Sequence, residues 1–150
     1  MTRFALAAAA AFMLLPPVPA AADAHVDPAV QAVIDAFDIA IRGDDTALAP
    51  VFAEDGVMMP ASGGRFEGHA EIAAWLAEFP DMTAFDVEVD EVMTLGDGFE
   101  TVIGTYTVTL PEEMGGATLP GEYVSIGRRE GDAMRVVRHV AFPPRMTMGQ

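Results

Sequence analysis

Residues 85–110, FDVEVDEVMTLGDGFETVIGTYTVTL, decide the fold class of this chain. Up to Val89, apolar residues alternate with acidic ones, which is typical of a strand with one buried and one solvated face. Gly96-Asp97-Gly98 predicts a tight turn, and residues 102–110 alternate again as a long second strand. The stretch therefore predicts an antiparallel hairpin.

The chain downstream extends this hairpin. Residues 111–121 are rich in glycine and proline and predict a loop, and residues 123–129 follow as a third strand. Glu130-Gly131-Asp132 predicts a turn into a last strand over residues 134–142. We therefore expect a meander of four antiparallel strands.

Upstream, apolar residues recur with helical spacing in three segments. The first helix starts at Asp27-Pro28, where aspartate caps the helix and proline takes its first position, and Gly43 ends it. A second short helix is capped by Asp44 or Asp45, and a third opens at Gly68. The residues that the second helix buries are expected to be Leu48, Val51 and Phe52.

A small hairpin, with strands at residues 57–59 and 65–67, lies between the second and third predicted helices. Helices folded onto one face of an antiparallel sheet give an α+β architecture. We expect a curved, cone-shaped sheet with the three N-terminal helices packed on its concave side. Such a cone leaves a pocket between the helices and the sheet.

The N-terminus has the features of a secretory signal. A short positive segment precedes an apolar run over residues 4–15, and Ala22-Asp23-Ala24 fits a cleavage pattern. We expect residues 1–24 to be removed and the protein to be periplasmic or secreted. Residues 25–142 would then form one domain, followed by a frayed tail at 143–150.

Charge and composition exclude several classes of partner. The net charge is -15, and all eight basic residues are arginine. Nucleic acid and anionic membranes would repel such a chain, so neither is expected as a partner. Four arginines, at positions 128, 129, 135 and 138, form either a solvated hairpin that balances acidic neighbours or a local patch that binds anions.

No cofactor and no metal is predicted. The chain has no cysteine, so thiolate chemistry and thiolate zinc sites are excluded. Its three histidines, His25, His69 and His139, have no ligand spacing, and no phosphate-binding or dinucleotide motif is present.

Several local phrases, in their order, resemble the NTF2-like superfamily in its SnoaL-like and DUF4440-like branch, which has the ketosteroid-isomerase-like fold. The phrases are Gly43-Asp44-Asp45, AEDGV at 53–57, FEGHAEI at 66–72, GRREG at 127–131 and RVVRH at 135–139. The resemblance covers residues 25–142 and implies the cone. It does not imply one function, because this fold hosts enzymes and binding modules alike.

The chain departs from the family's isomerases and cyclases at the catalytic positions. Those enzymes carry an acidic general base near the end of the first strand, where this chain has Met58-Met59-Pro60. The positions that correspond to the isomerase's oxyanion hole fall near Ala36 or Phe37 and near Ser125. We therefore do not expect the isomerase mechanism.

Candidate site residues follow from the expected cone. Its wall is expected to be apolar, although most of these residues would equally suit an ordinary core. The ligand-binding candidates are Phe37, Met58, Met59, Trp75, Phe79, Phe99 and Tyr123. The catalytic candidates are His139, Tyr106 and Glu91.

Two of the polar candidates have alternative interpretations. His139 either faces a ligand as a donor, acid or base, or is hydrogen-bonded within the sheet. Glu91 is in phase with the apolar side of its strand, so either a bulge turns it outward or it is a buried carboxylate with a raised pKa. We favour the bulge.

Three functions are compatible with the sequence. The first is an exported protein that holds a small, partly apolar molecule in its cone. The second is a SnoaL-like enzyme, of the isomerase, cyclase or dehydratase type, that acts on a small carbonyl compound. The third is an interaction module that pairs through the open sheet face of Thr105, Thr107 and Thr109. A homodimer is expected, and it is compatible with all three functions.

Overall fold

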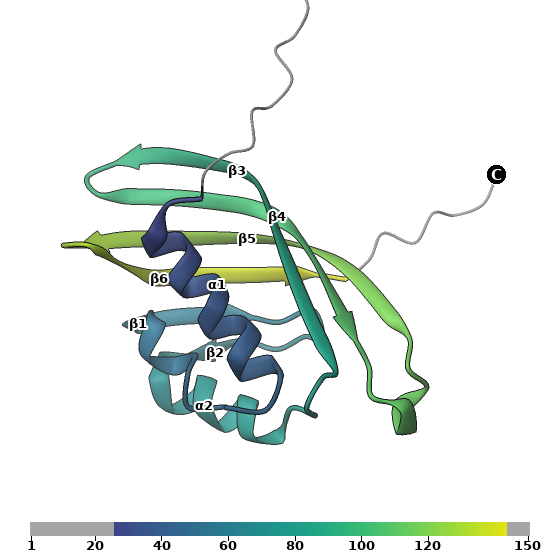
Figure 1. The fold of residues 1–150 in the computed structure, drawn as a ribbon. Helices are drawn as coiled ribbons and strands as arrows, with labels where there is room; N and C mark the ends of the chain where they lie inside the picture. The colour runs from purple at the N-terminus through teal and green to yellow at the C-terminus, as the bar shows by residue number, and fades with distance from the viewer. Residues whose placement is uncertain (1–25, 144–150) are drawn as a thin grey trace, which may run out of the picture.

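The structure is a computed structural model that describes residues 26–143, so the predicted signal peptide and residues 144–150 of the predicted tail lie outside it. One six-stranded sheet carries the fold (Figure 1). Its strands are β1 (Phe52–Met59), β2 (Phe66–Glu67), β3 (Ala84–Gly96), β4 (Phe99–Thr109), β5 (Thr118–Glu130) and β6 (Ala133–Phe142). The spatial order is β2-β1-β6-β5-β4-β3, in which β1 and β6 pair in parallel and the other neighbours pair antiparallel. The predicted α+β fold and its four-stranded meander are confirmed.

Helix α1 (Pro28–Ile41) lies across the concave face of this sheet (Figure 1). The side chain of Asp27 accepts a hydrogen bond from the amide of Ala29 at 2.8 Å, and Pro28 occupies the first helical position. Both features are those that the sequence predicts for the start of the helix. The buried stripe of α1, which includes Val30, Val33 and Ile41, packs on the core.

The second predicted helix is a shorter structure. Residues 45–48 form turns, Ala49–Val51 form a 3-10 helix (η1), and Phe52 already belongs to β1. Pro50 contributes to the difference, because a proline has no backbone N–H and cannot donate the hydrogen bond that would continue an α-helix through this segment. Leu48 and Phe52 are nevertheless buried in the core, as predicted. The domain therefore has two α-helices in its described part, α1 and α2 (Gly68–Glu78), where the sequence predicts three.

The predicted Asp55-Gly56 turn lies inside strand β1. The pairing of β1 with β6 is irregular between Phe52 and Val57, so this segment bulges without leaving the sheet. A Cβ atom at Gly56 would lie 2.9 Å from the carbonyl oxygens of Ala53 and Val136, a contact that only glycine avoids. The dipeptide therefore serves close packing against β6.

Each of the four clustered arginines has a partner on the protein. Arg129 donates to Asp27 at 2.9 Å and to Glu100 at 3.0 Å, which joins the start of α1 to strands β4 and β5. The hydrogen bond from Arg129 is also the largest cause of the lowered pKa of Asp27. The others bond Glu130 or a backbone carbonyl. The cluster balances neighbouring groups, as the first of the two interpretations predicts.

The Arg129 bridge gives a first testable expectation. Arg129→Met keeps most of the aliphatic stem and removes both ion pairs, so we expect a fall in Tm of roughly 4 °C. Arg42→Met is the matched control, because Arg42 is exposed and lies 3.7 Å from an exposed Asp38. Thermal unfolding at low and high salt measures both. An equal response of the two variants would contradict a special role for Arg129.

Candidate functional site

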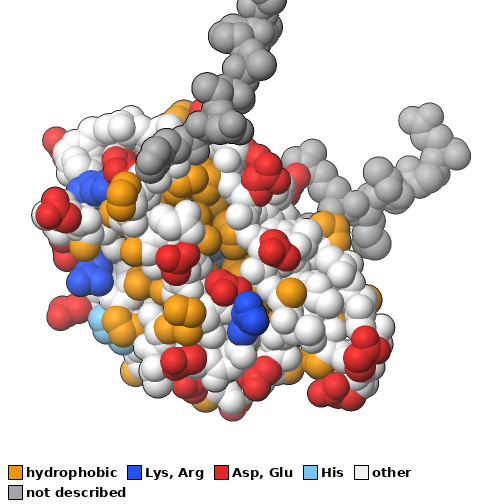
Figure 2. All heavy atoms as spheres, in the orientation of Figure 1, with side chains coloured by type: hydrophobic (Ala, Val, Ile, Leu, Met, Phe, Trp, Pro, Cys, Tyr) orange, Lys and Arg blue, Asp and Glu red, His pale blue; other side chains and the backbone are white. Residues whose placement is uncertain are grey.

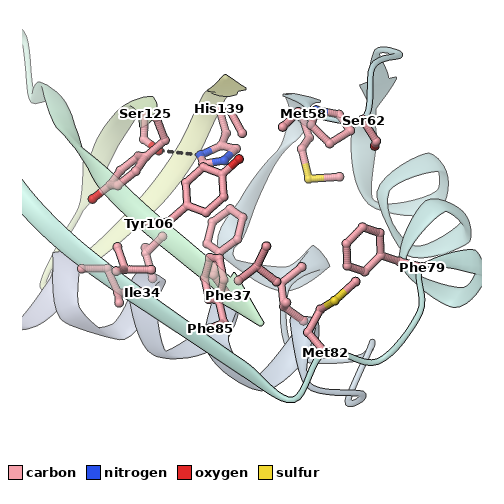
Figure 3. Close-up of a pocket in the computed structure, with 18 of the residues that line it drawn as sticks. Ile34, Phe37, Met58, Ser62, Phe79, Met82, Phe85, Tyr106, Ser125 and His139 are labelled. Atoms are coloured by element: carbon pink, nitrogen blue, oxygen red, sulfur yellow. Dashed lines mark hydrogen bonds between the residues drawn. The ribbon is translucent and has the colours of Figure 1, made fainter. Parts of the chain in front are cut away.

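A cavity of about 360 Å³ lies between the concave face of the sheet and the helices (Figure 3). Apolar side chains from α1, α2 and all four long strands of the meander line it, and none of the described residues in its wall is charged. Figure 2 shows hydrophobic side chains in a hollow beside α1. The wall includes Val33, Ile34, Phe37, Met58, Trp75, Phe79, Met82, Phe85, Val87, Val102, Leu110, Val136 and Ala141.

One buried polar pair interrupts this apolar wall. Ser125 on β5 and His139 on β6 are direct partners in the sheet register. The Ser125 Oγ atom lies 2.7 Å from the His139 Nδ1 atom (Figure 3). Both residues are buried and both line the cavity. The pair therefore supplies a buried polar group within an otherwise apolar wall.

The surroundings of His139 keep its ring neutral. Its centroid lies 4.6 Å from the ring of Phe37 and 5.9 Å from that of Tyr123. Burial among these groups lowers the pKa of His139 to about 4, because the charged imidazolium loses its hydration. At neutral pH the ring thus carries one hydrogen and no charge.

The two tyrosines of the wall use their hydroxyl groups to bind the sheet backbone. Tyr106 on β4 reaches over Gly121 on β5, and its hydroxyl donates to the carbonyl of Phe142 at 3.2 Å. The reverse arrangement holds for the second tyrosine, because Tyr123 on β5 lies over Gly104 on β4.

The hydroxyl of Tyr123 donates to the carbonyl of Glu88 on β3 at 3.5 Å. Burial raises the pKa of Tyr106, and burial with the nearby Asp90 charge raises the pKa of Tyr123 to about 12. The tyrosine hydroxyls thus stay protonated and are already engaged with the backbone.

The structure brings most of the predicted site residues together. The cavity wall contains Phe37, Met58, Trp75, Phe79, Tyr106, Tyr123 and His139. Ser62, at the loop after β1, and Ser125 also line it and are not among the sequence-based candidates.

Three predicted site residues, Met59, Phe99 and Glu91, do not line the cavity. Successive residues of a strand face opposite sides, so Met58 faces the cavity and Met59 does not. The same alternation sets Phe99 on the face opposite to Val102, which lines the cavity. For Glu91, the pairing of β3 with β4 shifts between Val89 and Glu91, and this bulge turns the carboxylate to solvent.

Residues 26–143 contain no group of three histidine or acidic side chains placed to hold a metal ion. None of the helices in this part of the chain is long and apolar enough to cross a membrane. At the end of β1, Met58 and Pro60 line the cavity with apolar side chains, and none of the described residues in the cavity wall carries a carboxylate.

A curved, mostly antiparallel sheet with a helix across its concave face and an apolar cavity between them defines an NTF2-like protein, a class that shares the cystatin-like fold. The SnoaL-like domain family matches residues 30–139, and the chain belongs to this family. No curated protein sequence matches the chain.

Solved structures share the fold at low sequence identity. A putative calcium/calmodulin-dependent protein kinase II association domain from Xanthomonas campestris is 19% identical, with a TM-score of 0.67 over 80% of this chain and 87% of that one. A ketosteroid isomerase-like protein from Erwinia carotovora atroseptica is 20% identical, with a TM-score of 0.61 over 79% and 92%. A type 2 hexachlorocyclohexane dehydrochlorinase is 13% identical, with a TM-score of 0.62 over 78% and 84%.

Proposed function

We propose that this protein binds a small, partly apolar molecule in the cavity between α1 and the sheet. The observation that carries the proposal is the cavity itself, about 360 Å³ in volume with an uncharged, mostly apolar wall. Sites for small molecules have volumes of roughly 300–1,000 Å³ and combine an apolar lining with a few polar groups. Met58 and Met82 suit such a wall, because a methionine side chain adapts to different shapes.

An ordinary hydrophobic core does not explain this space. Protein interiors are close-packed, and voids larger than a water molecule are few. Large side chains already surround the cavity, and the interior behind them is filled by Leu48, Phe52 and Ile72. An apolar space of this size beside a core of fully buried side chains favours a ligand over a packing defect.

Acid–base catalysis on a small carbonyl compound is the alternative, and dehydrochlorination is the activity of one structural neighbour. Such chemistry works best when the pKa of the base lies near the working pH. The pKa of His139 is lowered to about 4, so the neutral ring is a weak base at neutral pH. Because Glu91 also faces solvent, we place binding ahead of catalysis.

A cavity-filling variant tests the proposal. Ala141 on β6 lines the cavity, so Ala141→Phe should occupy part of it, whereas Ala32→Phe on the exposed side of α1 should not. We expect apolar probes such as tetralin and 2-tetralone to raise the Tm of the wild type and of Ala32→Phe. The affinity of Ala141→Phe for them should fall about tenfold or more, which is roughly 1.4 kcal/mol.

Calorimetric titration supplies the dissociation constants for this comparison. An equal response of Ala141→Phe and the wild type would show that the probes bind elsewhere. No stabilisation of the wild type by any neutral apolar probe would contradict the proposed function.

A further inference from the structure

We infer that the cavity presents one buried hydrogen-bond donor, the Nε2–H group of His139, and that it selects neutral apolar molecules that carry a carbonyl or similar acceptor oxygen. This inference rests on the proposed binding function and adds the chemical class of the ligand. Three observations carry it: the pairing of Ser125 with His139, the position of the second ring nitrogen, and the lack of charge in the wall.

The pairing of Ser125 with His139 determines which ring nitrogen carries the hydrogen. Among the described residues, Nδ1 of His139 is the hydrogen-bond partner found for Oγ of Ser125. If Nδ1 carried the hydrogen, it would donate to Oγ, and the buried hydroxyl hydrogen would have no acceptor. If the hydroxyl donates to Nδ1, both groups are satisfied. A neutral ring then carries its single hydrogen on Nε2.

The second ring nitrogen, Nε2, is open to the cavity. No hydrogen bond joins it to a described residue, and in residues 26–143 no buried side-chain nitrogen or oxygen lacks a partner. Since His139 itself lines the cavity, Nε2 borders the empty space (Figure 3). A ligand oxygen that accepts from Nε2–H is therefore the natural partner of this nitrogen.

The rest of the wall disfavours a charged ligand. No described residue that lines the cavity carries a charge, and the hydroxyls of Tyr106 and Tyr123 already donate to backbone carbonyls. A carboxylate or ammonium group would lose its hydration without gaining a counter-ion. The ring of His139 does not supply one, because burial lowers its pKa to about 4. A ketone, aldehyde or lactone meets both constraints.

Nitrogen NMR of the full chain tests the donor directly. The ¹⁵N shifts of a neutral imidazole distinguish the Nε2–H tautomer from the Nδ1–H tautomer, and the His139 signals are those absent from the double variant Ser125→Ala/His139→Phe. We expect Nε2–H in the wild type and a shift of Nε2 when 2-tetralone is added. An Nδ1–H tautomer would overturn the assignment of the donor.

Binding of a matched pair of probes tests the selectivity. In the double variant both members of the polar pair become apolar, which is less disruptive than leaving one of them unpaired. We expect the affinity for 2-tetralone to fall about tenfold in this variant, while that for tetralin changes less than about twofold. Tetralin-2-carboxylate should bind the wild type far more weakly than either neutral probe.

The outcomes separate this inference from the proposed function. If the double variant weakens both neutral probes equally, the acceptor preference is wrong and the cavity still binds apolar molecules. If tetralin and 2-tetralone both fail to bind the wild type, the proposed function fails together with the inference. Preferential binding of the carboxylate would overturn the neutral class of the ligand.

Discussion

Replacing Gly104 with alanine is expected to lower the free energy of unfolding by about 3 kcal/mol, which is a large fraction of the roughly 5–15 kcal/mol that is usual for folded proteins. The new Cβ atom would overlap the carbonyl oxygen of Glu88 on β3 and lie 2.9 Å from the ring of Tyr123. Relief requires a shift of the β3 backbone, and β3 pairs with β4 along most of its length. Urea unfolding of the purified variant measures the effect.

Gly121→Ala is the matched comparison. Its Cβ atom would overlap the outer end of the Tyr106 ring, which is a side chain and can move more easily than backbone. We expect a cost of about 1–2 kcal/mol, partly relieved when Tyr106→Leu is added. Two results would contradict this interpretation: an equal loss of stability in Gly121→Ala and Gly104→Ala, or no recovery of stability when Tyr106→Leu is added. Contact with the tyrosine rings would then not be the reason that glycine occupies these two positions.

Local patterns along the chain predict the sheet well because its strands follow one another in sequence. The alternation of Phe85, Val87 and Val89 with acidic residues, and the Gly96-Asp97-Gly98 turn, correspond to β3 and its hairpin. Strand β1 is harder to predict. Its partner β6 is distant in the sequence, and this pairing draws the Asp55-Gly56 dipeptide into the strand.

The candidate site depends on a shift in the pairing of β5 with β6, which the alternation of apolar and polar residues along the strands does not reveal. Counted back from the turn at Glu130-Gly131-Asp132, a regular hairpin would pair Ser125 with Arg138. The register between β5 and β6 instead shifts by one residue after Gly127, so Ser125 pairs with His139. A one-residue bulge therefore creates the polar pair, which explains why the sequence does not indicate Ser125 as the partner of His139.

The same limit applies to the two faces of the strands. Met58 and Met59 are both plausible wall residues by composition, but a strand directs only one of them to the cavity. Glu91 shows the opposite case, because its acidic character and the apolar phase of its neighbours together indicate a bulge. The structure contains that bulge. A bulge can therefore be predicted where a polar residue falls on the apolar side of a strand, as at Glu91. The bulge between β5 and β6 has no such mark in the sequence and is not predicted.

Stability is expected to rise with pH between about 4 and 6.5 by up to roughly 3 kcal/mol through His139 alone. The ordinary pKa of 6.5 applies in the unfolded chain, whereas burial lowers the pKa in the folded protein to about 4. Between these values the unfolded state binds more protons than the folded state, so acid favours unfolding. Above this range both states are neutral at His139 and its contribution is constant.

The double variant Ser125→Ala/His139→Phe isolates this effect from the other titrations. The chain has 23 acidic residues, and their protonation in acid changes both the repulsion between them and ion pairs such as those of Asp27. These contributions are shared by the wild type and the double variant, so they cancel in the difference between the two. Urea unfolding at pH 4.5, 5.5 and 7 should show a difference in the free energy of unfolding that grows in favour of the wild type as the pH rises.

A difference in the free energy of unfolding that does not change with pH would mean that the folded protein accepts a proton on His139 as readily as the unfolded chain. The ring would then be more hydrated than its buried position beside Phe37 and Tyr123 indicates, and a neutral donor in the cavity would lose its physical basis.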